Sequence, residues 1–213
     1  MKTLKILFGL LLLSITACTS GNEVEKQASD ADAVLKQAFD EKEIVLINQI
    51  ISYCDDYVLS KTDKNKSIKD AYQEFLTVNG PLAIEAGDGI SFPLDVAFFE
   101  TLDKDVLAKL FEVTDTLYRW IPERGIVKAE YSPYQLEVNL THKYSDFLKI
   151  LSTRNDFYSS YYKGFNVAGG ISPSMYSKIL DAFSKESEYK ETFDFSRKED
   201  RFAFIVPFIY RNS

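Results

Sequence analysis

Apolar residues recur at helical spacing along most of the chain after residue 31. The pattern predicts a long or broken helix over 31–59 and a second helix from Ser67, a good N-terminal cap, to the Asn-Gly-Pro stop at 79–81. The short polar link between them predicts an antiparallel helical hairpin. A third helix begins near Asp103 and must end before the break at 122–125.

The second half of the chain repeats this periodicity in shorter segments. The last apolar segment, 202–210, fits either a buried helix kinked at Pro207 or an edge strand. Ser196 and Glu199 have the spacing of a capping box, which favours the helix. Ser172-Pro173 predicts another helix start. The remaining helical stripes cover 144–151, 157–165 and 175–183.

Alternation with a period of two appears in one place, between 126 and 140. Leu136, Val138 and Leu140 alternate with polar residues, and 126–131 is compatible with a partner strand joined through Ser132-Pro133. The predicted fold class is therefore mainly α: a single compact multi-helix domain over 31–213, with at most one short β-hairpin at about 126–140.

Residues 1–17 have the pattern of a secretory signal peptide. Lys2 and Lys5 precede a mostly apolar run over 6–15, and the segment contains no acid. That run is too short to span a bilayer core, which needs about 20 apolar residues. We therefore expect 1–17 to be removed from the mature protein.

The signal ends in Ile15-Thr16-Ala17-Cys18, and this ending resembles the lipobox of bacterial lipoproteins. The resemblance covers residues 1–18 and implies that Cys18 becomes the first mature residue and carries lipid. It also implies a place in the bacterial cell envelope. The outer membrane is favoured, because Thr19 stands where an Asp would retain such a protein in the inner membrane. Two or three acyl chains anchor a protein stably, whereas one does so only marginally.

Residues 18–30 comprise this Cys and a polar stretch poor in large apolar groups, which predicts a flexible tether. Without 1–17 the chain carries a net charge of −9, which anionic lipid headgroups repel. The expected membrane contact is therefore the lipid on Cys18, with the body standing off the surface.

Composition narrows the classes of function. Of 213 residues, 46% are hydrophobic and 27% charged, which is ordinary for a folded domain. With 25 basic against 32 acidic residues, the chain lacks the basic face that nucleic acid binding needs, so no nucleic acid partner is expected. One His and two Cys cannot build a His/Cys zinc site, and we expect no metal or cofactor. Once Cys18 is acylated, Cys54 has no disulfide partner, and its apolar helical context predicts a small buried hydrophobe.

Catalytic signatures are absent from the sequence, which has neither a phosphate-binding Gly-rich loop nor a nucleophile elbow. His142 stands four residues before Asp146, which would permit a pair on a helix, but a surface His is the commoner outcome. Acids are numerous, and the adjacent Asp55 and Asp56 diverge on a helix, so we assign no catalytic residue.

Tyrosines are the most unusual feature, since 10 of the 13 follow residue 113. A Tyr ring with its polar tip suits stacking on sugars or contact with proteins, and it suits the inner edge of a helix equally well. Tyr158, Tyr161 and Tyr162 are the candidate ligand-binding residues.

These observations favour a lipid-anchored, non-catalytic lipoprotein that binds an envelope protein or glycan. An immunity or inhibitor protein is one such type, whose acidic charge would attract a basic partner. The alternative is a hydrolase of an envelope polymer that acts through paired carboxylates. That alternative requires two acids in one cleft, one of them buried with a raised pKa.

Overall fold

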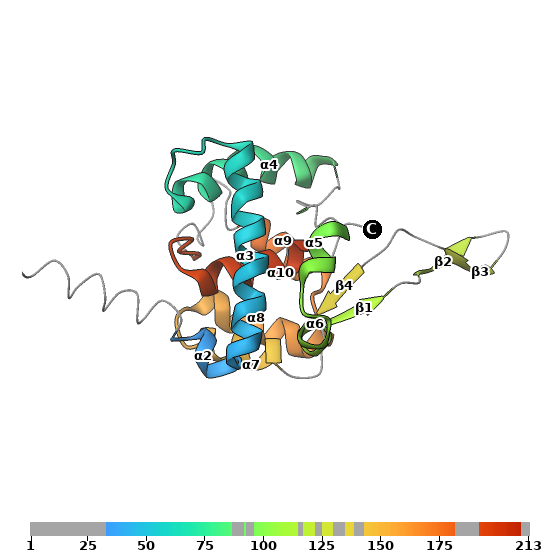
Figure 1. The fold of residues 1–213 in the computed structure, drawn as a ribbon. Helices are drawn as coiled ribbons and strands as arrows, with labels where there is room; N and C mark the ends of the chain where they lie inside the picture. Colours follow the sequence, from blue (N-terminus) through green and yellow to red (C-terminus); the bar gives the residue numbers. More distant parts are fainter. Residues whose placement is uncertain are drawn as a thin grey trace, which may run out of the picture.

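The computed structural model describes residues 33–86, 92, 96–114, 117–121, 125–129, 135–138, 143–181 and 192–209. The signal, the lipobox Cys18 and the tether lie outside the described residues, and so does His142. Within the described part, helices form a body, and the strands within 111–138 form an arm that projects from it (Figure 1). The predicted mainly α fold class is therefore confirmed.

The first predicted helix is broken into α2 (Leu35–Ala38) and α3 (Glu41–Lys61). Asp40 makes the break, because its side chain accepts a hydrogen bond from the Glu43 amide at 3.0 Å while the Glu43 carboxylate accepts one from the Asp40 amide at 2.9 Å. This reciprocal capping box starts α3. Phe39 fills the corner, with its ring centroid 5.5 Å from that of Phe147 and 5.8 Å from that of Phe202.

Helix α4 (Ile68–Ala86) begins where the sequence predicts and ends later. The Ser67 hydroxyl accepts a hydrogen bond from the Asp70 amide at 3.2 Å, as expected of the cap. The predicted stop at 79–81 is wrong, because the helix continues through it to Ala86. A proline within a helix removes one backbone hydrogen bond and its ring clashes with the carbonyl four residues earlier, so the sequence favoured a stop here although the helix continues. The predicted antiparallel hairpin is also wrong, since α4 crosses one end of α3 instead of lying along it (Figure 1).

The third predicted helix is short, and strands follow it. α5 (Val96–Thr101) and α6 (Lys104–Leu110) lead directly into β1 (Phe111–Thr114). Asp103 caps α6, accepting from the amides of Asp105 and Val106. The apolar stripe near residue 110 fits a helix end and a strand start equally well, which is why periodicity alone placed the boundary too late.

The hairpin expected at 126–140 has strands in the expected places but different partners. β3 (Gly125–Ala129) pairs with β2 (Leu117–Ile121), and β4 (Gln135–Val138) pairs with β1, both antiparallel. The predicted pairing of 126–131 with 136–140 is therefore wrong. β2 contains the sequence LYRWI, whose aromatic and β-branched residues favour extended backbone.

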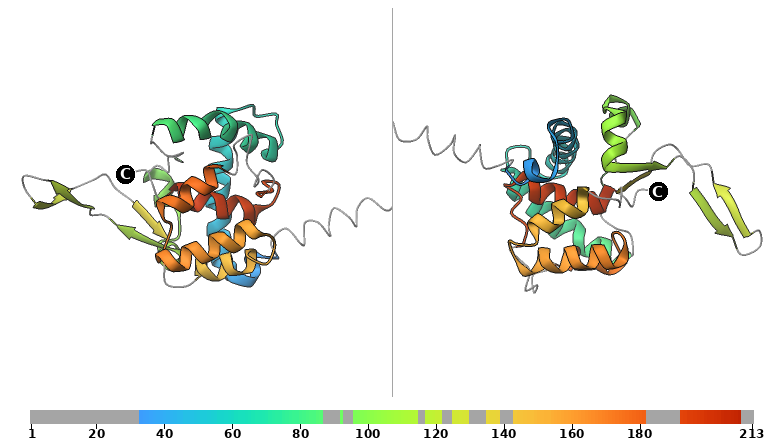
Figure 2. Two further views of the ribbon diagram at one scale, coloured as in Figure 1. Left: turned by 180° about the vertical axis from the view of Figure 1, so that it is seen from behind. Right: turned by 90° about the horizontal axis from the view of Figure 1, so that it is seen from below.

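Four further helices carry the core: α7 (Lys143–Leu151), α8 (Asp156–Ala168), α9 (Pro173–Asp181) and α10 (Lys198–Ile209). α10 lies in the middle of the body (Figures 1 and 2), and every residue from Glu199 to Ile209 is buried. The prediction of a buried final helix containing Pro207 is confirmed. The predicted capping box is wrong, because the Ser196 hydroxyl donates to Asp194 at 2.8 Å and the Glu199 carboxylate accepts from Arg154.

The core around α10 is largely aromatic. Cys54 is buried in it, so the prediction of a small hydrophobe is confirmed; burial, and then the charge of Asp55, raises the pKa of its thiol well above the usual value. Edge-to-face and tilted ring contacts predominate around Phe204, and such contacts add to the free energy gained by burial. The rings in contact with Phe204 are those of Tyr72, Phe92, Phe193, Phe195 and Phe208.

Candidate functional site

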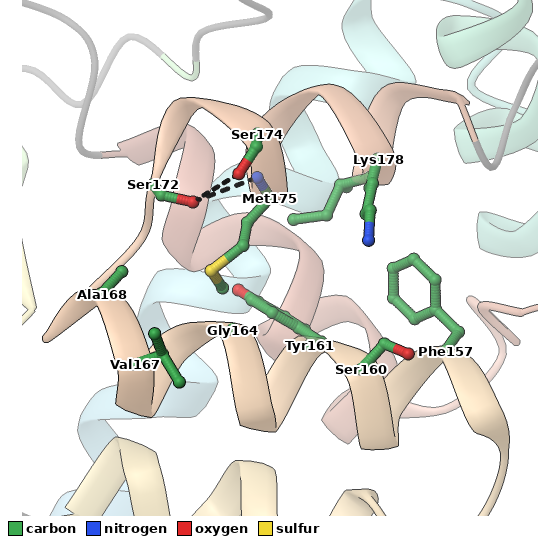
Figure 3. Close-up of a pocket in the computed structure, with 11 residues that line it drawn as sticks. Phe157, Ser160, Tyr161, Gly164, Val167, Ala168, Ser172, Ser174, Met175 and Lys178 are labelled. Atoms are coloured by element: carbon green, nitrogen blue, oxygen red, sulfur yellow. Dashed lines mark hydrogen bonds between the residues drawn. The ribbon is translucent and has the colours of Figure 1, made fainter.

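A pocket of about 360 Å³ lies between α8 and α9 (Figure 3). Its volume falls in the range of sites that hold small molecules. Apolar side chains and small residues make most of the wall. The residues that line it are Phe157, Ser160, Tyr161, Gly164, Val167, Ala168, Ser172, Ser174, Met175, Lys178 and Ile179.

Small residues on α8 leave the space for this pocket. Ser160, Gly164 and Ala168 follow one another at intervals of four, so they share one face of the helix. Met175 of α9 approaches this face closely, since a Cβ added to Gly164 would lie 3.2 Å from both Cγ and Sδ of Met175. At this point the wall of the pocket is formed by the flexible thioether of Met175, which packs against the backbone of α8 at Gly164.

Two caps fix the relative position of α8 and α9. Gly169 ends α8 in the left-handed conformation with φ 67°, and the Gly170 amide donates to the Phe165 carbonyl at 2.9 Å. The Ser172 hydroxyl then accepts from the Met175 amide at 3.3 Å, which confirms the predicted start of α9. The chain turns back at once, so one face of α9 lies opposite α8 (Figure 3).

Polar groups stand at the two ends of the pocket. Among the described residues that line the pocket, Lys178 is the one that carries a charge, and it lies at the end formed by Phe157 and Ser160 (Figure 3). Ser172 and Ser174 lie at the other side, where their hydroxyls are 2.9 Å apart. Val167 at the rim is 91% exposed, although it is apolar.

The three tyrosines expected to bind a ligand occupy different places. Tyr161 lines the pocket, but its hydroxyl lies 3.0 Å from that of Tyr144, which in turn donates to the Ala203 carbonyl at 3.2 Å. Tyr158 is buried and donates to Asp200 at 3.0 Å, while Tyr162 is half-buried and packs against the core. Of the three tyrosines, Tyr161 alone lines the pocket, and it presents its ring to a ligand. The sequence analysis did not predict the pocket. The spacing of Ser160, Gly164 and Ala168 was the signal that could have found it.

Buried charges gather at the start of α10. Arg154, after α7, donates to Glu199 Oε1 at 2.6 Å and to Asp200 Oδ1 at 3.0 Å. Asp200 also accepts from Tyr158 and, through Oδ2, from the Asp194 amide at 2.8 Å. Burial raises the pKa of Asp200 in spite of these donors, and the neighbouring charge of Glu199 raises it further.

A second ion pair, between buried Arg201 and partly buried Asp55, joins α10 to α3. Arg201 Nε lies 3.2 Å from Asp55 Oδ1, and its Nη1 donates to the Phe195 carbonyl at 2.6 Å. Tyr72 donates to the same Asp55 oxygen at 3.0 Å. Burial raises the pKa of Asp55 to about 6, against the lowering effects of Arg201 and Tyr72. Asp56 is exposed, so the two adjacent acids diverge as expected.

None of the acids Asp55, Glu199 and Asp200 is among the described residues that line the pocket between α8 and α9, and none of those lining residues is a carboxylate. Asp146 is exposed on α7. Among the described residues, no group of three or more acids, His or Cys is placed to hold a metal ion. In the same part of the chain, none of the helices has the apolar stretch that crossing a bilayer would require.

The arm is a second candidate site. Its described residues form two sheets of two strands each, in the order β1–β4 and β2–β3, and within this part of the chain each strand pairs on one side only. In Figures 1 and 2 the β2–β3 ribbon lies away from the helical body in every view. Open strand edges are templates for pairing with another chain.

No family model matches the chain, and the search of curated proteins and the search of solved structures returned no match either.

Proposed function

We propose that this chain is a lipid-anchored, non-catalytic binding protein of the bacterial cell envelope, which contacts a partner protein through its β-arm. The observation that carries the proposal is the position of the β2–β3 ribbon outside the helical body (Figure 2). A two-stranded ribbon alone is marginally stable in water, so an arm of this kind gains most when a partner covers it.

The proposed contact is addition of a strand from the partner to an edge of the arm. Backbone hydrogen bonds then supply affinity, and alternate side chains supply specificity. In β2 and β3 the register sets Tyr118 opposite Lys128 and Trp120 opposite Ile126. Tyr and Trp are enriched at protein interfaces. The acidic chain as a whole would attract a basic partner, as an immunity or inhibitor protein requires, while β2 and β3 themselves carry Arg119 and Lys128 and no acid.

The proposed anchor is the lipid on Cys18, in the outer membrane, with 18–30 as tether. Intact-mass spectrometry of the protein purified from membranes tests it. We expect the mass of a chain that begins at Cys18 and carries two or three acyl chains, and we expect Cys18→Ala to lose that mass and leave the membrane fraction. An unmodified Cys18, or a retained leader, would contradict the proposed anchor. Binding through the arm is tested separately and does not depend on this result.

The arm is tested by photo-crosslinking in cells. Benzoylphenylalanine replaces Lys128 of β3, with Lys149 on α7 as the matched control on the body, because Lys149 is exposed. We expect a discrete adduct with one partner protein at position 128, at least tenfold more abundant than at 149. Equal adducts at both positions, or none at 128, would refute binding through the arm.

The hydrolase alternative stays a prediction without support from the described residues. It requires two acids in one cleft, whereas Asp55 and Asp200 are each held by an arginine and lie outside the lining of the pocket.

A further inference from the structure

We propose that the pocket between α8 and α9 binds one fatty acid molecule, with its carboxylate on Lys178 and its acyl chain along α8. This inference is independent of the arm and of the anchor. It concerns a site that no catalytic or partner-binding role accounts for, and it commits to a free fatty acid as occupant.

The wall of the pocket suits an acyl chain. Phe157, Tyr161, Met175 and Ile179 are buried apolar or aromatic side chains that line it. The hydroxyl of Tyr161 is engaged with Tyr144, so the pocket meets its ring. A ligand that crosses this wall gains free energy from apolar burial and has few hydrogen bonds to make.

The shape of the pocket suits a single chain. The small residues from Ser160 to Ala168 span eight positions of α8, a length of about 12 Å at the rise of an α-helix. The pocket of about 360 Å³ adjoins this stretch, and Met175 approaches it at Gly164. Val167 at the rim is exposed and apolar. The tail of a longer fatty acid would cover it.

Charge determines the head group. Of the lining residues that the structure describes, Lys178 alone is charged, and it stands at one end of the pocket beside Phe157 and Ser160 (Figure 3). A cation at the end of an apolar trough complements an anionic amphiphile and repels a cationic one. Ser160, on the same end, adds a hydroxyl that can donate to a carboxylate. An alcohol or an amine of the same chain length lacks one or both of these interactions.

The test uses the full chain and a fatty acid that carries a photoreactive diazirine in its tail. After irradiation, adducts are mapped by peptide mass spectrometry, which works equally in a membrane sample. We expect adducts within 157–179. Excess laurate should suppress them, and dodecylamine should be at least tenfold less effective than laurate.

Two variants locate the head and the tail. Lys178→Glu reverses the charge on an exposed side chain, so the fold should be kept while labelling falls at least tenfold. Ser160→Trp fills the trough from an exposed position and should have the same effect. Lys163→Glu is the matched control, because Lys163 is an exposed lysine of α8 outside the lining, and it should leave labelling unchanged.

Three outcomes would overturn the proposal. The first is labelling spread over the surface with no preference for 157–179. The second is equal loss of labelling in Lys178→Glu and Lys163→Glu, or no loss in either. The third is a pocket that labels in Cys18→Ala but not in the unmodified chain, which would mean that the protein's own acyl chain occupies it.

Discussion

At the scale of residues, charged side chains at the start of α10 fix the position of that helix through ion pairs with other segments. Glu199, Asp200 and Arg201 are buried, and each has a partner on another segment. The sequence indicated a capping residue at Ser196, but the charges that follow it act across the fold instead. Local spacing could not reveal this, because Arg154 and Asp55 are far away along the chain.

Arg154→Leu should lower the free energy of unfolding by about 3 kcal/mol at pH 7, because it leaves two buried carboxylates without their cation. Arg197→Leu is the matched control, since Arg197 is 54% exposed in its pair with Asp194 whereas Arg154 is 24% exposed. The control should cost less than about 1 kcal/mol. Urea unfolding measures both, and equal losses would mean that the buried pairs contribute no more than the surface pair.

Asp55 should make stability depend on pH. Its pKa is about 6 when folded and near 3.8 when unfolded, so the folded state takes up the proton first as the pH falls. The free energy of unfolding of the unmodified chain should therefore rise, relative to that of Asp55→Asn, by about 2 kcal/mol between pH 7.5 and pH 4.5. Urea unfolding across this range checks it, with Asp56→Asn as the control. A difference that stays constant with pH would contradict the raised pKa.

At the scale of elements, two serine caps were predicted correctly, whereas the capping box at Ser196 and the stop at 79–81 were not. Ser67 and Ser172 start helices as predicted, because a hydroxyl that meets a free amide acts within one turn. The stop at 79–81 failed, because whether a helix continues depends on what its next turn packs against. The strands at 111–138 could be placed only in part, since pairing is a contact between distant residues that alternation does not specify.

Gly169 should be costly to replace in the α8–α9 turn. Its φ of 67° costs an L-residue about 1 kcal/mol, and an added Cβ would meet no atom within 4 Å, so the cost is of the backbone alone. Gly169→Ala should lower the free energy of unfolding by that amount, and Gly169→Asn by less, because Asn tolerates this conformation. Chemical denaturation distinguishes the two; an Ala variant as stable as the Asn variant would exclude this cause.

At the scale of the whole molecule, the arm and the body should be separable. Thr114 and Gln135 are paired in the β1–β4 register, so an Asn-Gly turn in place of 115–134 closes a hairpin there. We expect the shortened chain to unfold within about 2 °C of the full chain by circular dichroism, because the removed ribbon lies outside the core. It should also fail to compete with the full chain for the partner that crosslinks at position 128. A large fall in the midpoint would show that the arm supports the body.

The burial of α10 also governs the order in which the molecule can assemble. A polypeptide leaves the ribosome, or an export channel, with its earlier residues first. Helices α2 to α9 thus emerge before α10, and the apolar surface that α10 covers stays exposed until 198–209 arrive. A chain with such exposed apolar surface is incompletely folded and can bind chaperones during its synthesis or export. The core is complete only after α10, the last described helix, has emerged.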